Sequence, residues 1–531
     1  MDVNSAMSMY QFVKESLSSL KEDATLYYFK GKRITKARFF RDVNRVAGAL
    51  SELGINKGDV VAVNLPNYLN AIVVFYAVNQ LGAIANMIHP LIPFEAVSNI
   101  LSATKSKLFV TSDFFLKQNR EMFSTLSIKV VLCKASDYLP ILSGVIYNLS
   151  QKIVNTDLVI PYRKLLSHKP ISTTAFYDKN DSAVYLHSGG TTGDPKTVML
   201  SCYAFNELAQ DLYEVIGGSA PEDNASLMVL PLFHGFGLGV CMHTVLSYGM
   251  KTVLIPRFNA REVAKEVKRR RVTFCAGVPL MYDKLNRLCE KDFAKLKTLR
   301  FMFCGGDKLT EELKKSFDNH LKAVGDNYEI LEGYGLTETV NVCTVNKQGY
   351  CVNSCVGYPL RNIEINILSE DGRALPVGEK GEIAVRSETI MLGYLGGSKV
   401  ENIIDRDGAK WLLTGDVGYL DKEGRLYFCD RIKRTFKVNG VNVYPSEIEQ
   451  VLSGIDIVKE CFVSKFVGAG KEGVKAYVSL RKDVLEERDA KKKILSVCAE
   501  KLIKYAVPRE IIFMERLPRT PVGKIDSAKL S

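Results

Sequence analysis

The feature that most constrains this chain is the alternation, from about residue 35 to 335, of amphipathic helical stretches with short apolar runs. Thr35 is suited to cap a helix that carries Phe40, Val43 and Leu50 on one side and ends at Gly54. Apolar runs typical of strands follow at residues 60–65, 107–110, 129–133, 227–230, 252–255 and 299–304. This pattern predicts α/β layers with mainly parallel sheets.

The pattern of apolar and polar residues changes beyond about residue 340. Short strands at 363–368 and 381–386 are separated by turn residues such as Asp371-Gly372, which indicates hairpins in a small β-rich subdomain over about 340–430. A compact α/β segment follows Arg431, and 531 residues exceed what one core accommodates. We therefore predict an N-terminal domain over residues 1–430 and a C-terminal domain over 431–531.

No transmembrane segment is expected, although residues 225–250 contain no Asp, Glu, Lys or Arg. Pro231, His234, His243 and four glycines interrupt this stretch, which favours a buried strand, a loop and a helix over one membrane helix. The first residues lack a basic region followed by an apolar block, so no secretory signal is predicted. We expect a cytoplasmic protein.

Cysteine usage and charge narrow the function further. The twelve cysteines form no Cys-x-x-Cys pair and no Cys/His cluster, which is typical of free thiols in a reducing compartment. The formal charge is +12, and residues 430–531 carry 21 basic against 14 acidic side chains. A basic small domain suits an anionic, phosphate-bearing ligand, whereas no aromatic spacing favours nucleic acid.

A glycine-rich segment that follows an apolar strand carries the first sign of chemistry. Its glycines allow several backbone N–H groups to converge on an anion, while hydroxyl groups and one ammonium add further donors. These residues are Ser188, Gly189, Gly190, Thr191, Thr192, Gly193 and Lys196. The segment predicts a phosphate-binding loop, but Asp194-Pro195 separates the last glycine from the lysine, so it differs from the common nucleotide-binding loop.

Four more segments follow in order: Glu332–Glu338 (EGYGLTE), Trp411–Asp416 (WLLTGD), Asp430–Gly440 (DRIKRTFKVNG) and Pro518–Ile525 (PRTPVGKI). With the glycine-rich loop, they resemble the signature motifs of the adenylate-forming superfamily, which includes acyl-CoA synthetases. The resemblance covers nearly the whole chain. It implies a large N-terminal domain of two α/β subdomains with a small β-barrel-like subdomain, and a small mobile C-terminal α+β lid.

The resemblance also implies an activity: a carboxylic acid, fatty or aryl, attacks ATP to give an acyl-adenylate and pyrophosphate, and the acyl group passes to coenzyme A. Both reactants are anions, so cations and N–H donors must surround the phosphates. The implied nucleotide contacts are Ser188 to Lys196 on the β- and γ-phosphates, Thr337 on the α-phosphate, Glu338 on Mg²⁺, Asp307, Glu332, Gly333 and Tyr334 around adenine, Asp416 and Arg431 at the ribose, and Asn442.

The remaining implied roles belong to the C-terminal segment and to the acyl pocket. Lys524 is expected to bridge the carboxylate and the α-phosphate during adenylation, and Lys433 to be the pivot of the lid. Lys437, Asn439 and Gly440 are expected to contact coenzyme A. His234 is expected at the gate of the acyl pocket, with an ordinary packed histidine equally compatible with the sequence.

Three residues depart from the family's pattern. Thr197 stands where glycine is usual and is expected to tighten the phosphate loop, Lys308 replaces a small residue beside Asp307 and is expected to alter adenine contacts, and Arg434 replaces an acidic residue beside the hinge. Two alternatives stay open: transfer to the phosphopantetheine of an acyl carrier protein, and a catalytically silent nucleotide-binding module. The acid is not identified by the sequence.

Overall fold

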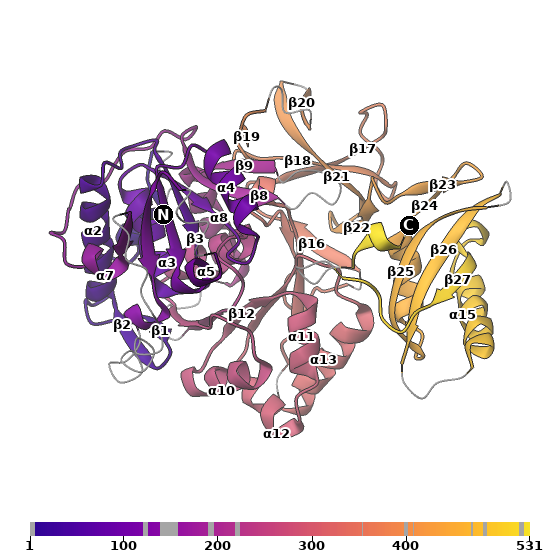
Figure 1. Ribbon diagram of the computed structural model, residues 1–531. Coiled ribbons are helices and arrows are strands. Elements are labelled where there is room, and N and C mark those ends of the chain that lie inside the picture. Colours follow the sequence, from indigo (N-terminus) through magenta and orange to yellow (C-terminus); the bar gives the residue numbers. More distant parts are fainter. Residues whose placement is uncertain are drawn as a thin grey trace.

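The fold is taken from a computed structural model, and Figure 1 shows its chain from the N-terminus in indigo to the C-terminus in yellow. The structure describes residues 6–119, 126–138, 158–188, 196–217, 224–325, 327–352, 354–397, 402–406, 408–468, 471–481, 486–519 and 525–530. The architecture is α/β, with a large N-terminal part and a small C-terminal part that follows residue 431, as the sequence predicts.

The first sheet has eight strands among the described residues, in the order β19-β9-β8-β4-β3-β5-β6-β7. Its central pairs are parallel. The strands are β3 (Val60–Asn64), β4 (Ile84–Met87), β5 (Leu108–Ser112), β6 (Lys129–Cys133), β7 (Val159–Pro161), β8 (Ser182–Ser188), β9 (Lys196–Ser201) and β19 (Gly393–Tyr394). Helices of this region are α1 (Met9–Ser16), α2 (Lys36–Glu52), α3 (Leu69–Gln80), α4 (Phe94–Ala103), α5 (Asp113–Gln118) and α7 (Tyr162–Leu165).

The second sheet has fourteen strands among the described residues. Its first part is mainly parallel and contains β1 (Thr25–Phe29), β2 (Lys32–Thr35), β10 (Ala225–Met228), β11 (Lys251–Leu254), β12 (Phe274–Gly277), β13 (Phe301–Cys304) and β14 (Ile330–Tyr334). Helices α8 (Cys202–Val215), α10 (Ala260–Arg270), α11 (Pro279–Asn286), α12 (Glu290–Phe293) and α13 (Glu311–Ala323) accompany it. Strand β1, from before the predicted alternation, pairs in parallel with β11.

The β-rich region continues the second sheet through antiparallel pairs and does not stand apart from it. It comprises β15 (Thr344–Val345), β16 (Cys355–Pro359), β17 (Glu364–Leu368), β18 (Gly381–Arg386), β20 (Ile403–Arg406), β21 (Ala409–Leu420) and β22 (Leu426–Arg431). The predicted hairpin is present, because β17 pairs antiparallel with β18.

The local predictions hold where the sequence pattern is strongest. Helix α2 begins after Thr35, whose hydroxyl accepts a hydrogen bond from Arg38 N, and the chain leaves the helix through Gly54 at φ +88°. The uncharged stretch 225–250 forms strand β10, a loop, the π-helix η4 (Phe236–Thr244) and the short helix α9 (Val245–Ser247). In the described part of the chain, no helix is both long and apolar enough to cross a membrane.

The C-terminal part has its own apolar core, distinct from the core that spans both large sheets. It comprises the hairpin β23 (Phe436–Val438) and β24 (Val441–Val443), the helices α14 (Pro445–Ser453) and α15 (Glu487–Lys501), and the sheet of β25 (Val458–Gly468), β26 (Lys471–Leu480) and β27 (Pro508–Phe513). A separate core is what a segment that moves as one body requires. The boundary at residue 431 itself stays a prediction.

Candidate active site

The predicted phosphate loop begins and ends on two paired strands. Ser188 ends β8 and Lys196 begins β9, and the two residues face each other in the antiparallel ladder. The hydroxyl of Ser188 donates to the carbonyl of Lys196 at 3.3 Å. Both ends of the loop are thereby fixed, whereas Gly189, Gly190, Thr191, Thr192 and Gly193 lie outside the described residues, so their role stays a prediction.

Thr197 anchors the base of this loop through a buried histidine. The ring of His187 lies between Thr197 Oγ1, 3.1 Å from Nδ1, and Asn86 Oδ1, 2.7 Å from Nε2. Burial lowers the pKa of His187 to about 4, so the ring is neutral at pH 7. The threonine that stands where the family has glycine therefore makes a polar contact that glycine lacks.

Tyr394 connects two of the predicted phosphate and metal residues, and the sequence did not reveal it. Its hydroxyl donates to Glu338 Oε1 at 2.8 Å, while Lys196 Nζ lies 4.6 Å from the centre of its ring. Strand β19 places Tyr394 by pairing with β9, and Met391 N donates to the carbonyl of Glu338. Thr337 and Glu338 lie in the short 3₁₀ helix η6 (Thr337–Thr339) after β14. In the sequence, the dipeptide Gly393-Tyr394 is the local feature that could have indicated this short strand.

A second group of predicted site residues lies where β14, β21 and β22 approach one another. The hydroxyl of Tyr334 donates to Asp416 Oδ2 at 2.8 Å, and Arg431 Nε lies 3.5 Å from Asp416 Oδ1. Burial raises the pKa of Asp416 and outweighs the opposing effects of Tyr334 and Arg431. The ring of Phe428 lies 5.9 Å from that of Tyr334. Three residues predicted to face adenosine are therefore in contact.

Glu332 lies in the middle of β14, and Asp307 lies in the turn after the neighbouring strand β13. Glu332 pairs with Cys304 in the parallel ladder, and burial raises the pKa of its carboxyl to about 7. Asp307 is exposed in the turn that follows β13 and accepts a hydrogen bond of 2.9 Å from Lys308 N. The side chain of Lys308 does not turn toward this end of the strands, because its Nζ donates to the carbonyl of Ser446. The structure thus gives no support to an adenine contact from Lys308.

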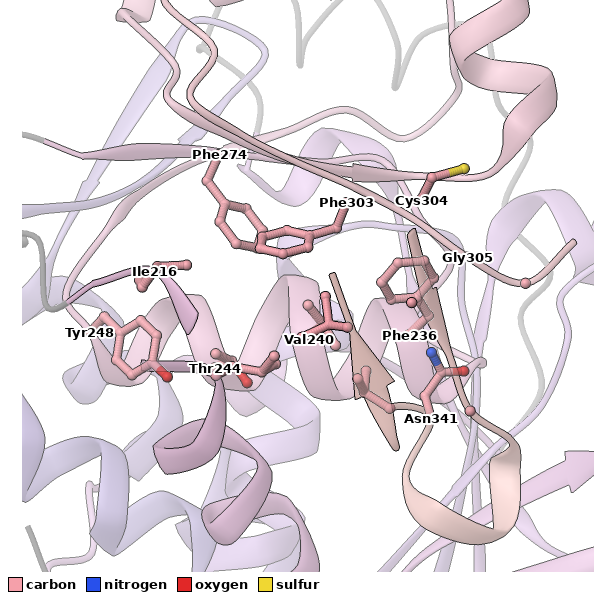
Figure 2. Close-up of a pocket in the computed structure, with 16 residues that line it drawn as sticks. Ile216, Phe236, Val240, Thr244, Tyr248, Phe274, Phe303, Cys304, Gly305 and Asn341 are labelled. Atoms are coloured by element: carbon pink, nitrogen blue, oxygen red, sulfur yellow. The ribbon is translucent and has the colours of Figure 1, made fainter. Parts of the chain in front are cut away.

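A cavity with about 540 Å³ of empty space, part of it open to solvent, adjoins the carboxyl ends of β13 and β14, and Figure 2 shows the side chains that line it. One wall is the π-helix η4, which presents Phe236, Val240 and Thr244 at intervals of four residues. Phe274 and Phe303, whose rings are 5.3 Å apart, form another wall. None of the described residues that line the cavity carries a charge, so this lining suits an uncharged, mainly apolar group.

Glycines form the end of the cavity nearest Glu332. Gly305, Gly306, Gly333 and Gly335 line it. A Cβ at Gly335 would lie 1.9 Å from the carbonyl oxygen of Asn341, and one at Gly333 would lie 3.0 Å from that of Thr344. A side chain at Gly335 would clash with this backbone and one at Gly333 would be tightly placed, so both glycines allow close packing against residues 341–344.

His234 lies exposed in the loop before η4, and its ring contacts that of Phe233 at 4.6 Å. Phe236, two residues later at the start of η4, lines the cavity, whereas His234 is not among the lining residues. The gating role of His234 stays a prediction.

The predicted coenzyme A residues occupy a different place. Asn439 and Gly440 form the turn of the β23–β24 hairpin, with φ of +51° and +81°, as a type I′ turn requires, and Lys437 faces Asn442 across it. The hairpin lies beyond β22 and far from β8 (Figure 1), with Lys437 Nζ 3.6 Å from Glu370. The structure therefore does not bring these residues to Tyr334 and Asp416.

The structure describes only the two ends of the last motif, Pro518–Ile525. An antiparallel bridge between Arg519 and Ile525 brings together the two ends of segment 520–524. Lys524 lies outside the described residues, so its role in adenylation stays a prediction. Lys433 lies in the turn that joins β22 to β23, between the two domains.

Comparison with known proteins gives one consistent family. The chain matches AMP-binding enzymes over residues 14–395 and the AMP-binding enzyme C-terminal domain over residues 447–524. It is 31% identical to a long-chain-fatty-acid–CoA ligase of Bacillus subtilis, over 95% of this chain and 90% of that protein. It is 30% identical to the probable 4-coumarate–CoA ligase 3 of Dictyostelium discoideum, with 91% and 87% covered.

Solved structures agree in fold. An anthranilate CoA ligase in complex with anthranoyl-AMP superposes with a TM-score of 0.85 at 24% identity, over 100% of this chain and 97% of that one. An O-succinylbenzoate coenzyme A synthetase from Bacillus subtilis, in complex with ATP and magnesium ion, superposes with a TM-score of 0.80 at 25% identity, over 99% of each chain.

Proposed function

The chain belongs to the family of AMP-binding enzymes. From this membership we propose that it activates a monocarboxylic acid, fatty or aryl, whose acyl part is uncharged and mainly apolar. It is an AMP-forming acid–thiol ligase: it uses ATP and Mg²⁺ to convert a carboxylic acid into an acyl-adenylate, with release of pyrophosphate, and transfers the acyl group to coenzyme A. The acid and the roles of individual residues are the proposal.

The single observation that carries the choice of acid is the uncharged cavity. A second carboxylate or an ammonium group on the acyl part would be buried without a partner of opposite charge, which costs several kcal/mol. An alkyl chain or an aromatic ring gains from the same walls, at about 25 cal/mol for each Å² of apolar surface buried. Amino acids and dicarboxylic acids are therefore poor substrates under this proposal.

The nucleotide is proposed to bind along the strand ends beside the cavity. Gly305, Gly306 and Gly333 line the cavity next to Tyr334, and adenine is proposed to lie against their backbone. Asp416 accepts hydrogen bonds from the ribose hydroxyl groups, because a carboxylate has acceptor positions to spare beyond the one that Tyr334 occupies. Arg431 lies beside Asp416 at the proposed ribose position.

The triphosphate is proposed to lie toward Ser188 and Lys196, with Thr337 on the α-phosphate. Glu338 fits Mg²⁺, because its carboxylate offers the hard oxygen that this ion prefers and Tyr394 fixes its orientation. When bound, Mg²⁺ neutralises negative charge on the phosphates. The side chains of this chain then position the acid near the α-phosphorus and reduce repulsion between two anions.

The test is a product analysis across a panel of acids. Purified protein with ATP, Mg²⁺ and a suitable acid is expected to form AMP and pyrophosphate, and hydroxylamine is expected to trap the acyl group as a hydroxamate. Short, medium and long fatty acids and aryl acids are compared with amino acids and dicarboxylic acids. ADP as the main nucleotide product, or preference for a charged acyl part, contradicts the proposal.

Two alternatives are decided by the same assay. A carrier-protein phosphopantetheine uses the same thiol chemistry as coenzyme A, so each acceptor is offered in turn. A catalytically silent nucleotide-binding module requires loss of a central group, yet Lys196, Glu338, Asp416 and Arg431 are present. No acid-dependent AMP from any acid favours this module.

We also propose residues 1–430 and 431–531 as the two domains, which differ in their cores. A cytoplasmic location is proposed because ATP and coenzyme A are available there and the twelve cysteines follow no disulfide pattern.

A further inference from the structure

The two domains meet mainly through polar side chains. Lys380 pairs with Glu447, Arg481 NH2 lies 3.6 Å from Glu312, and Lys437 Nζ lies 3.6 Å from Glu370. The apolar clusters of the two domains are separate among the described residues. Contacts of this kind permit a domain to change its orientation, so the contact with the largest free energy decides which orientation predominates.

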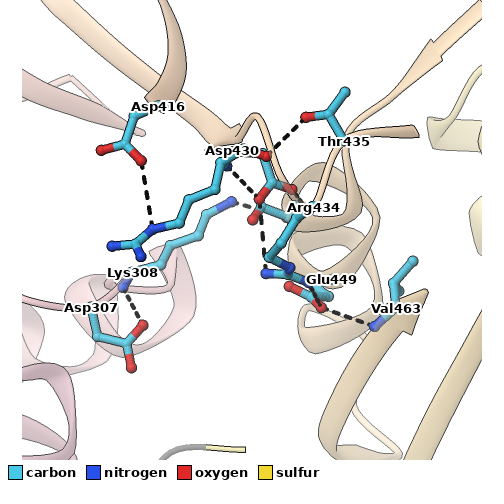
Figure 3. A network of polar contacts seen from close by, with 10 residues as sticks. Asp307, Lys308, Asp416, Asp430, Arg434, Thr435, Glu449 and Val463 are labelled. Carbon is cyan, nitrogen blue, oxygen red and sulfur yellow. Dashed lines mark hydrogen bonds and ion pairs between the residues drawn. The ribbon is translucent and has the colours of Figure 1, made fainter. Parts of the chain in front are cut away.

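Lys308 makes a contact between the domains that is less exposed than these ion pairs. Its Nζ donates to the carbonyl of Ser446 at 3.0 Å, across 138 residues of sequence, and Figure 3 shows the side chain reaching from the turn after β13 to the start of α14. Its own backbone N–H donates to Asp307. One residue thus joins the strand end proposed to lie near adenine to the first turn of a helix in the other domain.

Carboxylates surround the ammonium of Lys308. Burial lowers the pKa of Lys308, and the carboxylates of Glu449, Asp430 and Glu447 offset part of this effect. Asp430 already accepts a hydrogen bond of 2.7 Å from Ser446 N, and Glu449 Oε1 lies 2.6 Å from Arg434 NH2. Lys308 thus places a positive charge near Glu449 and Glu447 of the C-terminal domain and near Asp430 at the end of its own domain (Figure 3).

Two of the ion pairs between the domains are more exposed. The two side chains are 34% and 43% exposed in the Lys380–Glu447 pair, and 50% and 58% exposed in the Arg481–Glu312 pair. Exposed pairs contribute little because water screens them, whereas a hydrogen bond from a partly buried ammonium contributes more, and its loss leaves the carbonyl of Ser446 without this donor.

We propose that Lys308 is a positioning residue that holds the C-terminal domain in the orientation of this structure, in which the β23–β24 hairpin lies away from Tyr334 and Asp416. The inference rests on the proposed function, since that hairpin must approach the nucleotide site when coenzyme A accepts the acyl group. Loss of the Lys308 side chain therefore shifts the population toward other orientations.

The half-reactions give the first readout. With Lys308→Ala, acid-dependent pyrophosphate exchange is expected to fall about tenfold, as for loss of one hydrogen bond from a charged group. Transfer from supplied acyl-adenylate to coenzyme A is expected to keep at least the parent rate. Lys308→Arg keeps the charge and is expected to recover part of the exchange, and Lys268→Ala, on the exposed face of α10, is the matched control.

The second readout measures orientation without catalysis. Two fluorophores replace the exposed side chains of Lys322 on α13 and Lys491 on α15, and energy transfer between them is recorded in the full-length, ligand-free protein. Lys308→Ala is expected to lower the population with the parent distance, and Lys268→Ala to leave it unchanged. An unchanged distance distribution, or equal loss of both half-reactions, overturns the inference. Absence of acid-dependent AMP from the parent overturns the proposed function instead, and leaves the distance measurement valid.

Discussion

The hydroxyl of Tyr394 donates a 2.8 Å hydrogen bond to Glu338 Oε1, and this contact joins the first sheet to the turn that follows the last parallel strand of the second. The two residues are 56 positions apart. Because the same ring lies under Lys196 Nζ, one tyrosine orients both the proposed Mg²⁺ ligand and the proposed phosphate cation.

Tyr394→Phe tests this role. The substitution keeps the ring near Lys196 but leaves Glu338 without its donor, and a hydrogen bond to a charged group contributes about 1.5–3 kcal/mol. We expect kcat/KM for ATP in acid-dependent pyrophosphate exchange to fall about tenfold or more, with a raised Mg²⁺ requirement. Tyr350→Phe, at a residue 67% exposed, is the control. Parent kinetics in Tyr394→Phe would show that Glu338 needs no such support.

Glu332 gives a pH prediction. Burial raises its pKa from 4.5 to about 7, so the folded protein keeps this proton while the unfolded chain loses it as pH rises above 4.5. The folded state therefore loses stability relative to the unfolded state between about pH 4.5 and pH 7, by about 3 kcal/mol. In Glu332→Gln the side chain is neutral throughout, so its melting temperature relative to the parent is expected to be higher at pH 8 than at pH 5. The same difference at both pH values would contradict the raised pKa.

The β23–β24 turn allows a test with a matched pair of variants. Gly440 has φ +81°, and a Cβ there meets no atom within 4 Å, so Gly440→Ala and Gly440→Trp share the same backbone strain and differ in bulk. If this turn lines the thiol path, Trp is expected to block thioester formation while Ala retains most of it. Both variants are expected to retain pyrophosphate exchange. Loss of exchange in Gly440→Trp alone would place the turn elsewhere.

Thr244 tests the acyl cavity. It lies along the π-helix wall between the glycine end and Tyr248, and its hydroxyl is buried without a hydrogen-bond partner among the described residues (Figure 2). Thr244→Phe is expected to lower kcat/KM at least tenfold for acids long enough to reach this depth, with short acids unaffected. Thr244→Val keeps the volume and is expected to preserve the length preference. A uniform loss across all acids would mean that the substitution disturbs folding.

Lys524→Ala tests the step assigned to the last motif. Removal of one electrostatic contact made in the transition state costs about 3 kcal/mol, or roughly a hundredfold in rate. Pyrophosphate exchange is expected to fall by that factor, while transfer from supplied acyl-adenylate to coenzyme A continues at the parent rate. Normal exchange would make Lys524 an ordinary surface lysine.

The sequence predicts what short-range physics determines. The cap of α2 at Thr35 and the strands Lys129–Cys133 and Gly381–Arg386 follow from hydrophobic period and turn chemistry, and other predicted strands differ from the structure by one or two residues at their ends. The motif residues Tyr334, Asp416 and Arg431 meet in space as the family resemblance implies.

The sequence does not predict contacts that only the tertiary structure creates. Tyr394 lies on a two-residue strand, too short for a pattern, and reaches Glu338 because β19 pairs with β9. Lys308 was expected to act at adenine because it follows Asp307, yet a lysine side chain is long enough to reach away from its backbone neighbour to Ser446. Arg434, a departure without an assigned partner, pairs with Glu449.

The cavity has a consequence for how such enzymes diversify. Its described lining runs from Leu212 to Val345, so the described walls of the proposed acyl site are all encoded before the C-terminal domain begins. Exchange of gene segments between relatives beyond residue 431 would leave the choice of acid with the N-terminal parent. Selectivity for the acid and transfer to the thiol acceptor can therefore be inherited, and selected, as separate modules.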